Sequence, residues 1–351
     1  MIDHVIKLYT DTEYCARQAG LEYVSAEAPG WTRQVQGTGF SYQDARGNTA
    51  QGKTRAWIES LAIPPAWKDV WISKNEKAHI LATGQDDAGR KQYLYHPKWR
   101  EFRDHLNHYR LIPFGQSLPK IRRYVSRVIG QDELSRELLI AAVIGLIDKT
   151  HIRIGNRQYL EANDSYGATT LSNDNVAVSA DKITLDFVGK SGKAHEVVLT
   201  SKPLMRVIRQ LNDEEGSFLF SYFDDDGEEQ SVTSSDVNVA LQEIAGFRIT
   251  AKDFRTWAGT VVAFKTALRE EKKDAKLSLQ DIYQAVADEL GNTVAMARDH
   301  YIHKDLLEVI RKQELAELVD AAKPLEIAGL TLSENQLLAV LIQLQEGVEF
   351  I

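Results

Sequence analysis

The sequence predicts an α+β fold in which a β-rich first part is followed by a mostly helical second part. Short runs separated by glycine and aspartate turns fill about the first hundred residues, a pattern typical of antiparallel strands. From about Pro97 onward, apolar residues recur at intervals of three and four, which indicates helices. One group of strands, within residues 175–199, interrupts the helical series. With 351 residues, 43% of them hydrophobic, the chain is long enough for two domains with proper cores.

We divide the chain into three parts. Residues 1–100 are expected to form a β-rich N-terminal domain, and residues 101–320 a mostly helical domain that contains a small sheet. Residues 321–351 are expected to form an acidic tail with a short helix. Ser333 and Gln336 have the spacing of a capping box, so we expect this helix to begin there.

In the first domain, short segments bounded by turn residues predict the strands of an antiparallel sheet. These segments are 32–36, 39–42, 70–73, 78–83 and 91–95. A short helix over about 54–61 should end at Ile63-Pro-Pro65, because a proline excludes its predecessor from the helical region.

In the second domain, apolar spacing predicts a series of helices. They cover 118–128, 131–149, 204–211, 235–245, 258–269, 279–290 and 293–312. We expect Tyr301 to lie on the last of them, and Asn292 to lie on the same helix at its start. The strands of the β interlude are 175–178, 182–188 and 194–199. The turn Gly189–Lys193 joins the last two strands, so Lys190 should sit at a hairpin tip, where its side chain is free to reach over a substrate.

Composition and charge limit the possible partners and location. Cys15 is the only cysteine, so no internal disulfide can form and a reducing cytosol is expected. The longest apolar run, residues 138–147, is half the length that a membrane span needs. The first residues show no basic start leading into an apolar segment, so no export signal is expected. We therefore predict a cytoplasmic protein with no membrane partner.

The net charge is −8, but its distribution leaves room for a nucleic acid. Residues 51–127 hold 15 Lys and Arg against 7 Asp and Glu, a local surplus of 8 positive charges. The acidic residues gather instead in 201–250 and 301–351. Contact with phosphates requires a local positive surface rather than a positive total. Chance variation along the chain is the competing explanation.

A set of polar residues at separate places supplies the groups for metal-free phosphoryl transfer to a tyrosine. Arg153 and Arg255 present planar forks that stabilise charge on phosphate oxygens. Asn292 is an additional donor, and Lys190 is a proton donor for a leaving oxygen. Tyr301 is the nucleophile, and nearby cations would favour its phenolate. Taken singly, each residue is explained as well by a salt bridge, a solvated charge or a packed aromatic ring.

We expect no metal site. The acidic run 223–229 has consecutive rather than alternating carboxylates, which cannot all point inward as in a calcium loop, so we expect a solvated turn.

The ordered set resembles the type IB DNA topoisomerases, in the compact poxvirus-like form found in bacteria. The resemblance extends from about residue 20 to residue 312. Its motifs are Gly89–Trp99, Arg153-Ile-Gly-Asn, Val188-Gly-Lys190, Lys252-Asp-Phe-Arg255-Thr-Trp257, Gly291-Asn-Thr and Tyr301. It implies that the catalytic residues are Tyr301, Arg153, Lys190, Arg255 and Asn292, and that DNA is contacted by Arg90, Lys91, Gln92, Tyr93, Arg157 and Tyr159. The viral members usually have histidine in place of Asn292. Asparagine still donates a hydrogen bond, but it cannot carry charge.

The resemblance also implies a fold and an activity. The fold would be a two-lobed clamp, with an antiparallel β-sheet lobe and a helical catalytic lobe of the tyrosine recombinase and topoisomerase IB type. Tyr301 would cleave one strand of duplex DNA, giving a 3′-phosphotyrosyl intermediate, and the duplex would swivel and be religated. Neither ATP nor a metal would be required, because the covalent link keeps the bond energy. We expect a monomer whose partner is double-stranded DNA, in the cytoplasm on the nucleoid.

Two alternatives remain. A tyrosine recombinase shares the nucleophile, but recombinases typically carry histidine where this chain has Lys252, and their N-terminal lobe is helical. A noncatalytic DNA-binding or scaffold protein would explain the basic segment but not the tyrosine set. Relaxation of a supercoiled plasmid distinguishes the three.

Overall fold

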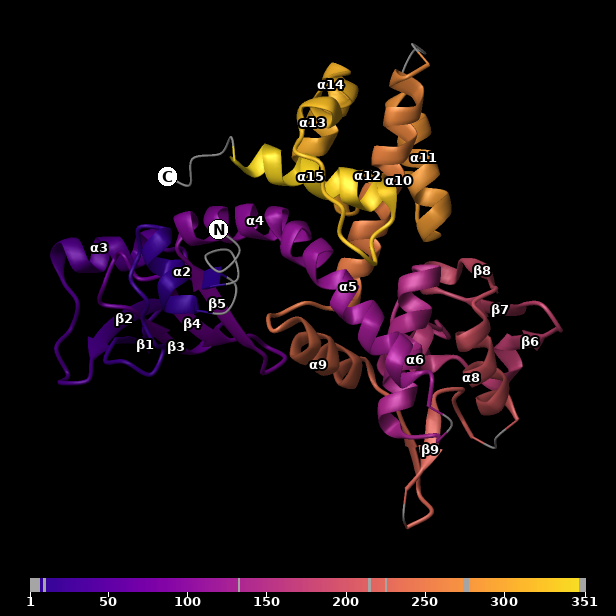
Figure 1. The fold of residues 1–351 in the computed structure, drawn as a ribbon. Coiled ribbons are helices and arrows are strands. Elements are labelled where there is room, and N and C mark those ends of the chain that lie inside the picture. The colour runs from indigo at the N-terminus through magenta and orange to yellow at the C-terminus, as the bar shows by residue number, and fades with distance from the viewer. Residues whose placement is uncertain are drawn as a thin grey trace. The chain divides into compact units, whose positions relative to one another are not determined.

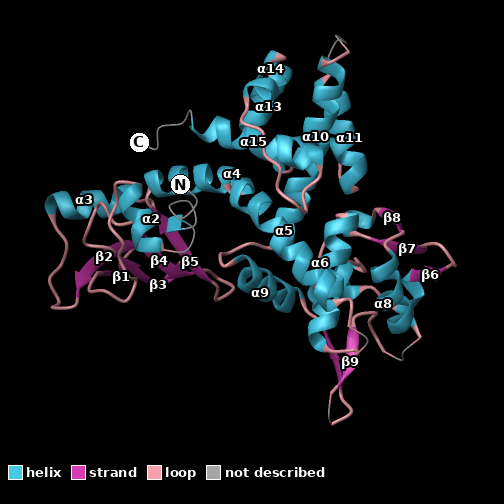
Figure 2. Ribbon diagram, viewed as in Figure 1, coloured by secondary structure: helices cyan, strands magenta, loops and turns pink. Residues whose placement is uncertain are grey.

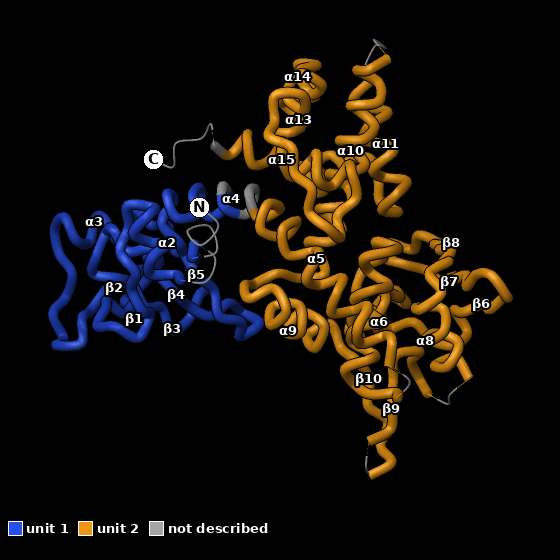
Figure 3. Tube along the Cα trace, viewed as in Figure 1, with its two compact units in different colours: residues 1–108, 349–351 blue, residues 109–348 orange. Residues whose placement is uncertain are grey.

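The computed structural model describes residues 7–8, 11–131, 133–213, 216–224, 226–273 and 278–346. The chain divides after His108 into two compact units, which Figure 3 shows in different colours and which are treated separately below. None of the helices in the described ranges is both long enough and apolar enough to cross a membrane.

The first unit contains the predicted antiparallel sheet. Its strands are β1 (Trp31–Gln36), β2 (Gly39–Asp44), β3 (Lys68–Ile72), β4 (Ile80–Gln85) and β5 (Lys91–Tyr95). They lie in the order β2-β1-β3-β4-β5, and neighbouring strands are antiparallel (Figures 1 and 2). The predicted short helix is α3 (Gly52–Ser60), which ends before the two prolines. Helix α2 (Thr12–Gln18) was not predicted, because seven residues are too few to show a period.

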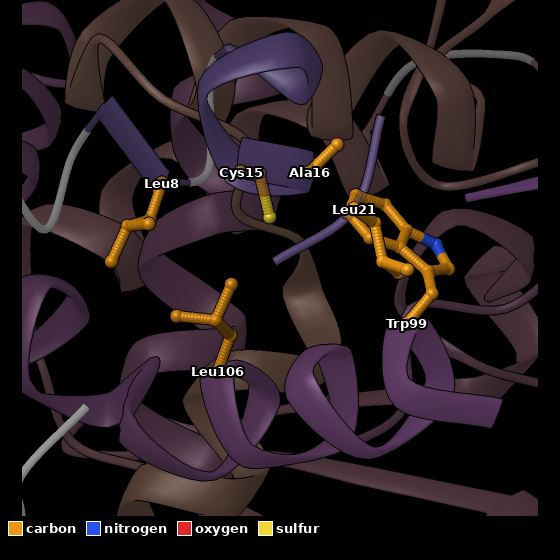
Figure 4. Close-up of a cluster of buried hydrophobic side chains, with 6 residues drawn as sticks. All are labelled: Leu8, Cys15, Ala16, Leu21, Trp99 and Leu106. Atoms are coloured by element: carbon orange, nitrogen blue, oxygen red, sulfur yellow. The ribbon is translucent and has the colours of Figure 1, made fainter. Parts of the chain in front are cut away.

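The described residues of the first unit form two small apolar cores. One lies on the sheet and includes Ile58 of α3 and Ile72 of β3. The other joins α2 to α4 (Pro97–Tyr109), and Figure 4 shows its side chains gathered between these two helices. Its members are Leu8, Cys15, Ala16, Leu21, Trp99 and Leu106. Burial raises the pKa of the Cys15 thiol, so this cysteine is a packing residue rather than a reactive one.

The second unit is mostly helical, as predicted. Its helices are α5 (Leu111–Val128), α6 (Arg136–Thr150), α7 (Arg157–Asn163), α8 (Lys202–Asn212), α9 (Ser234–Ala245), α10 (Ala251–Glu271), α11 (Leu279–Leu290), α12 (Val294–His300), α13 (Lys304–Lys312), α14 (Leu315–Ala321) and α15 (Leu332–Glu346). The apolar run 138–147 lies in α6 and is buried throughout, so it is a core helix.

Several predicted helix boundaries were wrong. Helix α10 begins seven residues before the predicted start at Ala258, and its first turns bury Asp253 and Arg255. These buried polar residues interrupt the apolar pattern from which the start was inferred. Helix α6 begins five residues later than predicted, because the side chain of Ser135 accepts a hydrogen bond from the amide of Leu138 and forms the N-cap.

The prediction of a single helix over 293–312 was also wrong. The chain forms α12 and α13, separated by Tyr301, Ile302 and His303. Thr293 is the N-cap of α12, and its hydroxyl accepts a hydrogen bond from the amide of Met296. Asn292 therefore lies in the turn before α12, after Gly291 ends α11 in the left-handed conformation. Tyr301 is the C-cap residue that directly follows α12 rather than a residue within a continuous helix.

Two small sheets complete the second unit. The β interlude forms a three-stranded antiparallel sheet of β6 (Val176–Val178), β7 (Ile183–Val188) and β8 (Ala194–Leu199), in that order. A short hairpin of β9 (Ser221–Phe223) and β10 (Glu229–Ser231) was not predicted. The acidic run 223–229 starts at the end of β9 and finishes at the beginning of β10, and between them the Asp224 carboxylate accepts the amides of Asp226 and Glu228.

The last described helix is part of the second unit. Helix α15 packs against α5, α10 and α14, and its capping box is formed by Thr331 and Glu334 rather than by the predicted Ser333 and Gln336. The same Glu334 carboxylate binds Arg122 of α5 and the indole of Trp257. A buried carboxylate thus ties α15 to the two helices beneath it.

Candidate active site

A pocket of about 880 Å³ in the second unit brings together four of the five predicted catalytic residues. Arg153, Lys190, Arg255 and Tyr301 all line it. The fifth, Asn292, is not part of the lining but is buried and bonded to both arginines. These residues come from the loop after α6, the β7–β8 turn, helix α10, the end of α12 and the turn after α11, so the site is assembled from five separate segments.

The acceptors that hold Arg255 in the described structure are neutral. It is 3% exposed, and its guanidinium donates to the backbone carbonyls of His151 and Leu290 and to the side-chain oxygen of Asn292. Burial, followed by the charge of Arg153, lowers the pKa of Arg255, but a guanidinium stays protonated in proteins. Among the described residues no carboxylate pairs with it, so its charge is available to an anion.

The loop that carries Arg153 is fixed by close backbone packing. The amides of Ala168 and Thr169 donate to the carbonyls of Arg153 and Ile154. A side chain at Gly167 would meet the backbone nitrogen of Gly155 at 2.5 Å, so this approach requires a glycine. The Arg153 guanidinium then donates to the side-chain oxygen of Asn292 at 2.5 Å.

Asn292 links the two arginines and keeps one donor unused. Its side-chain oxygen accepts from both guanidinium groups, which orients its nitrogen as a donor. That nitrogen is buried and has no hydrogen-bond partner among the described residues, and the same holds for Nε of Arg255. An unpaired buried donor costs about 1–3 kcal/mol. The two unpaired nitrogens belong to side chains that are hydrogen-bonded to each other.

Tyr301 lies 7% exposed beside these cations. The Arg255 guanidinium carbon is 5.2 Å from the centre of the Tyr301 ring. Burial pushes the pKa of the Tyr301 hydroxyl upward, but Arg255, with Arg153 and Lys252, pushes it further down, so the net pKa lies below the ordinary value. The surroundings therefore favour the phenolate.

The backbone of Tyr301 lies directly against α10. A side chain at Gly259 would meet the Tyr301 carbonyl oxygen at 2.5 Å, and the hydroxyl of Thr260 donates to the same oxygen at 3.4 Å. Glycine inside a helix costs up to about 1 kcal/mol relative to alanine. This close approach explains why α10 contains one.

Lys190 lies at the turn between β7 and β8, as predicted. It begins a single 3-10 turn, Lys190–Gly192, in which Ser191 has the left-handed backbone conformation. Its side chain is exposed, lines the pocket, and has no ion-pair partner in the described part of the chain.

The predicted DNA contacts lie in two places. Tyr159 of α7 lines the pocket and is 60% exposed, whereas Arg157 donates to the Ser231 hydroxyl and lies over the Phe218 ring. The other four predicted contacts belong to the first unit: Lys91, Gln92 and Tyr93 lie on β5, and Arg90 directly precedes it. There Arg90 and Gln92 both bind the Asp86 carboxylate. Lys91 lies over the ring of Tyr93, which stacks on Tyr95.

Sequence reasoning missed several residues of the pocket. Lys252 lines it and lowers the pKa of Tyr301, although it lies in the same short motif as Arg255. Asn156, the last residue of the Arg153-Ile-Gly-Asn motif, also lines it, as do Ser234 and Asn238, which no motif in the sequence singles out. In the described ranges no three His, Cys, Asp or Glu side chains gather as a metal-binding group.

Comparison with known proteins gives the family. The family described as "Eukaryotic DNA topoisomerase I, catalytic core" matches residues 96–321, and "Bacterial DNA topoisomerase IB, N-terminal domain" matches residues 39–86. The DNA topoisomerase 1B of Acanthamoeba polyphaga mimivirus is 30% identical over 263 residues, which cover 72% of this chain and 78% of that protein. That of Vaccinia virus (strain Copenhagen) is 23% identical over 280 residues, covering 75% and 83%.

Among solved structures, the XerH site-specific recombinase bound to palindromic difH substrate superposes with a TM-score of 0.35 and 16% identity. The match covers 56% of this chain and 51% of that one. The two family matches and the mimivirus relative are sufficient by themselves: the chain belongs to the type IB DNA topoisomerases, which are isomerases.

Proposed function

We propose that this protein relaxes supercoiled duplex DNA by cleaving one strand with Tyr301, letting the duplex swivel and rejoining the strand, without ATP or a metal ion. One observation carries the proposal. A buried tyrosine with a lowered pKa lies beside arginines that no described carboxylate neutralises, next to two buried donors without partners. That arrangement fits a phosphodiester that is attacked by the tyrosine.

Cleavage begins at the tyrosine. After its proton has gone to water, the Tyr301 oxygen attacks a backbone phosphorus, the new oxygen–phosphorus bond forms, and the bond from phosphorus to the 5′ oxygen breaks. The product is a 3′-phosphotyrosyl enzyme and a strand that ends in a 5′-hydroxyl. The lowered pKa of Tyr301 supports this role, because a phenol at its ordinary pKa of about 10 is a poor nucleophile at neutral pH.

The arginines and Asn292 stabilise the charge that develops on the non-bridging oxygens. Preorganised donors of this kind contribute roughly 3–4 kcal/mol each. Arg255 and Arg153 are fixed in place by Asn292, so little reorganisation is needed when the phosphate arrives. The unpaired nitrogens of Asn292 and Arg255 are the donors that a phosphate oxygen would satisfy.

Lys190 supplies the leaving group with a proton. Its ammonium gives a proton to the departing 5′ oxygen, and the reverse transfer activates the 5′-hydroxyl during religation, when Tyr301 departs as a phenolate. Its position on the pocket rim, with no described ion-pair partner, supports this role. Because the phosphotyrosyl link conserves the bond energy, no nucleotide is consumed.

The proposal keeps the partner, location and assembly that the sequence predicts. The substrate is double-stranded DNA, with most contacts to phosphates, and the protein acts as a monomer on the nucleoid in the cytoplasm.

The direct test is relaxation of a supercoiled plasmid in EDTA without nucleotide. We expect full relaxation, and added magnesium should do no more than speed turnover by aiding product release. A strict requirement for ATP or a divalent metal would contradict the proposal. Recombinant products without relaxed plasmid would favour the recombinase alternative.

A further inference from the structure

His195 occupies an unusual place between two segments of the site. It lies on β8, opposite Phe187 of β7, and its ring stacks on the Phe187 ring with 5.1 Å between centroids and 11° between planes. A side chain at Gly189 would meet the His195 ring at 2.7 Å, and one at Gly291 would meet it at 2.3 Å. One ring therefore fills the space beside both glycines, which directly precede Lys190 and Asn292.

The His195 ring explains why residue 189 is a glycine, although the backbone conformation there does not require one. Gly189 has φ −96°, a conformation open to any residue, yet any side chain there would overlap His195. Gly291 differs, because its φ of +59° at the end of α11 already favours glycine. At Gly189, therefore, packing of His195 is the constraint.

A second contact joins the same two segments. The ammonium of Lys193 donates to the backbone carbonyl of Asn292 at 3.2 Å, and the Lys193 carbonyl accepts the amide of Gly189. The β7–β8 turn is thereby tied to the turn after α11, which in turn holds both arginines through Asn292. Burial, with the charges of Arg153, Lys193 and Arg255, lowers the pKa of His195, so the ring packs in its neutral form.

We propose that His195 is a positioning residue that holds the Lys190 turn in register with the Asn292 turn, so that the proton donor and the oxyanion donors face one phosphate. This inference rests on the proposed function. His195 does not act on DNA itself; it acts through Lys190 and Asn292. A displacement of about 1 Å at a reacting group can lower a rate by about a hundredfold, so packing of this kind affects catalysis directly.

The test compares single-turnover cleavage of two DNA substrates, one normal and one with a 5′-bridging phosphorothiolate, whose sulfur leaves without a proton. We expect His195→Ala to cleave normal DNA about 10- to 100-fold more slowly than wild type. Much of this loss should be recovered on the phosphorothiolate, because that substrate does not need Lys190. Val197→Ala, on the same face of β8, is the control for the sheet and should keep a rate near that of wild type with no selective recovery.

Two further variants test the packing itself. His195→Phe keeps a flat ring on Phe187 and should retain most of the rate, because the proposal assigns no hydrogen bond to the imidazole. Gly189→Ala should slow cleavage through its clash with the ring. The double variant Gly189→Ala/His195→Ala should then lose less than the product of the two single losses.

Three results would overturn the inference. His195→Ala could cleave at the wild-type rate, it could lose the same factor in rate on the normal and the phosphorothiolate substrate, or the rate losses of the two single variants could multiply in the double variant. Thermal unfolding of each variant shows whether it is folded. If His195→Ala does not fold, the cleavage rates of His195→Phe and Gly189→Ala test the inference instead. Because wild-type cleavage is measured beside them, failure of the proposed function would show as an inactive wild type, whereas failure of this inference leaves wild type active.

Discussion

Asn292 shows how one small side chain organises the site. Its oxygen accepts from Arg153 and Arg255, and its nitrogen remains without a partner in the described structure. The members of this set could be predicted from the sequence only because their short motifs follow one another in order along the chain, since each residue taken singly has an ordinary structural explanation. The hydrogen bonds from the two arginines to Asn292 could not be predicted. Arg153 is 139 residues and Arg255 is 37 residues away from Asn292 in the sequence, and only the fold brings them together.

The role of Lys190 can be separated from that of Arg255 by changing the leaving group. Lys190→Ala should be slow on normal DNA and largely recovered on a 5′-bridging phosphorothiolate, because sulfur departs without a proton. Arg255→Ala should stay slow on both, since its charge acts on the non-bridging oxygens. Single-turnover cleavage rates give the answer. Equal recovery of both variants, or of neither, would remove Lys190 from the general-acid role.

Gly259 should be intolerant of the smallest side chain. Gly259→Ala would place a methyl group 2.5 Å from the Tyr301 carbonyl oxygen, so the backbone of Tyr301 must move. We expect cleavage to fall at least about tenfold, although alanine is otherwise the better helix former. Gly39→Ala is the matched control, because a side chain there meets nothing within 4 Å. Similar rates for Gly259→Ala and wild type would show that Tyr301 tolerates displacement.

At the scale of elements, the spacing of apolar residues predicted most of the described helices. It gave wrong boundaries for α10 and α12, which carry residues of the site. The break between α12 and α13 lies at Tyr301 itself, and the early turns of α10 bury the polar residues Asp253 and Arg255. A periodic pattern records apolar burial, so it cannot register polar residues that are buried with hydrogen-bond partners, as Asp253 and Arg255 are. The role of α15 was likewise invisible, because it depends on Glu334 reaching two distant helices.

Glu334 should make stability depend on pH. Burial alone would raise its pKa, but Arg122 and the Thr331 amide outweigh burial and lower the pKa from 4.5 to about 2. Because the folded pKa is depressed, the stabilisation is complete above the ordinary pKa of 4.5 and is lost as pH falls from there toward about 2. The shift corresponds to about 3 kcal/mol at neutral pH.

Glu334→Gln should therefore lower the free energy of unfolding by about 3 kcal/mol at pH 7. The gap from wild type should narrow toward about pH 3.5. Denaturant unfolding at several pH values measures both. Glu308→Gln, which removes the charge from an exposed pair with Arg311, is the control and should leave the free energy of unfolding nearly unchanged. A gap that does not change with pH would show that the Glu334 charge is not what holds α15.

At the scale of the whole molecule, the α+β class and the family could be predicted, because the motifs of the resemblance follow one another in order along the chain and the strand-rich and helical regions are separate. Net charge was the least informative whole-chain property. A total of −8 coexists with a local surplus of positive charge in residues 51–127. For DNA binding the local surplus is the relevant quantity.

Salt dependence tests whether that basic segment contacts phosphates. Replacing Arg90 and Lys91 together by glutamine should weaken DNA binding on all sequences and reduce the slope of log affinity against log salt by about 2, one for each lost phosphate contact. Lys7→Gln with Arg17→Gln removes the same charge from exposed residues of the first unit outside the segment and should leave the slope nearly unchanged. Equal slopes for the Arg90/Lys91 variant and wild type would mean that these side chains face solvent.

The most direct measurement is to trap the covalent intermediate and locate it. Rapid denaturation of the enzyme during reaction with duplex DNA should leave the DNA attached by its 3′ end, and peptide mapping should place the link on Tyr301. Tyr301→Phe should fold and bind DNA as wild type does but form no adduct, because it lacks the attacking oxygen. An adduct on another tyrosine such as Tyr283, or an adduct formed by Tyr301→Phe, would contradict the assignment of Tyr301 as the nucleophile.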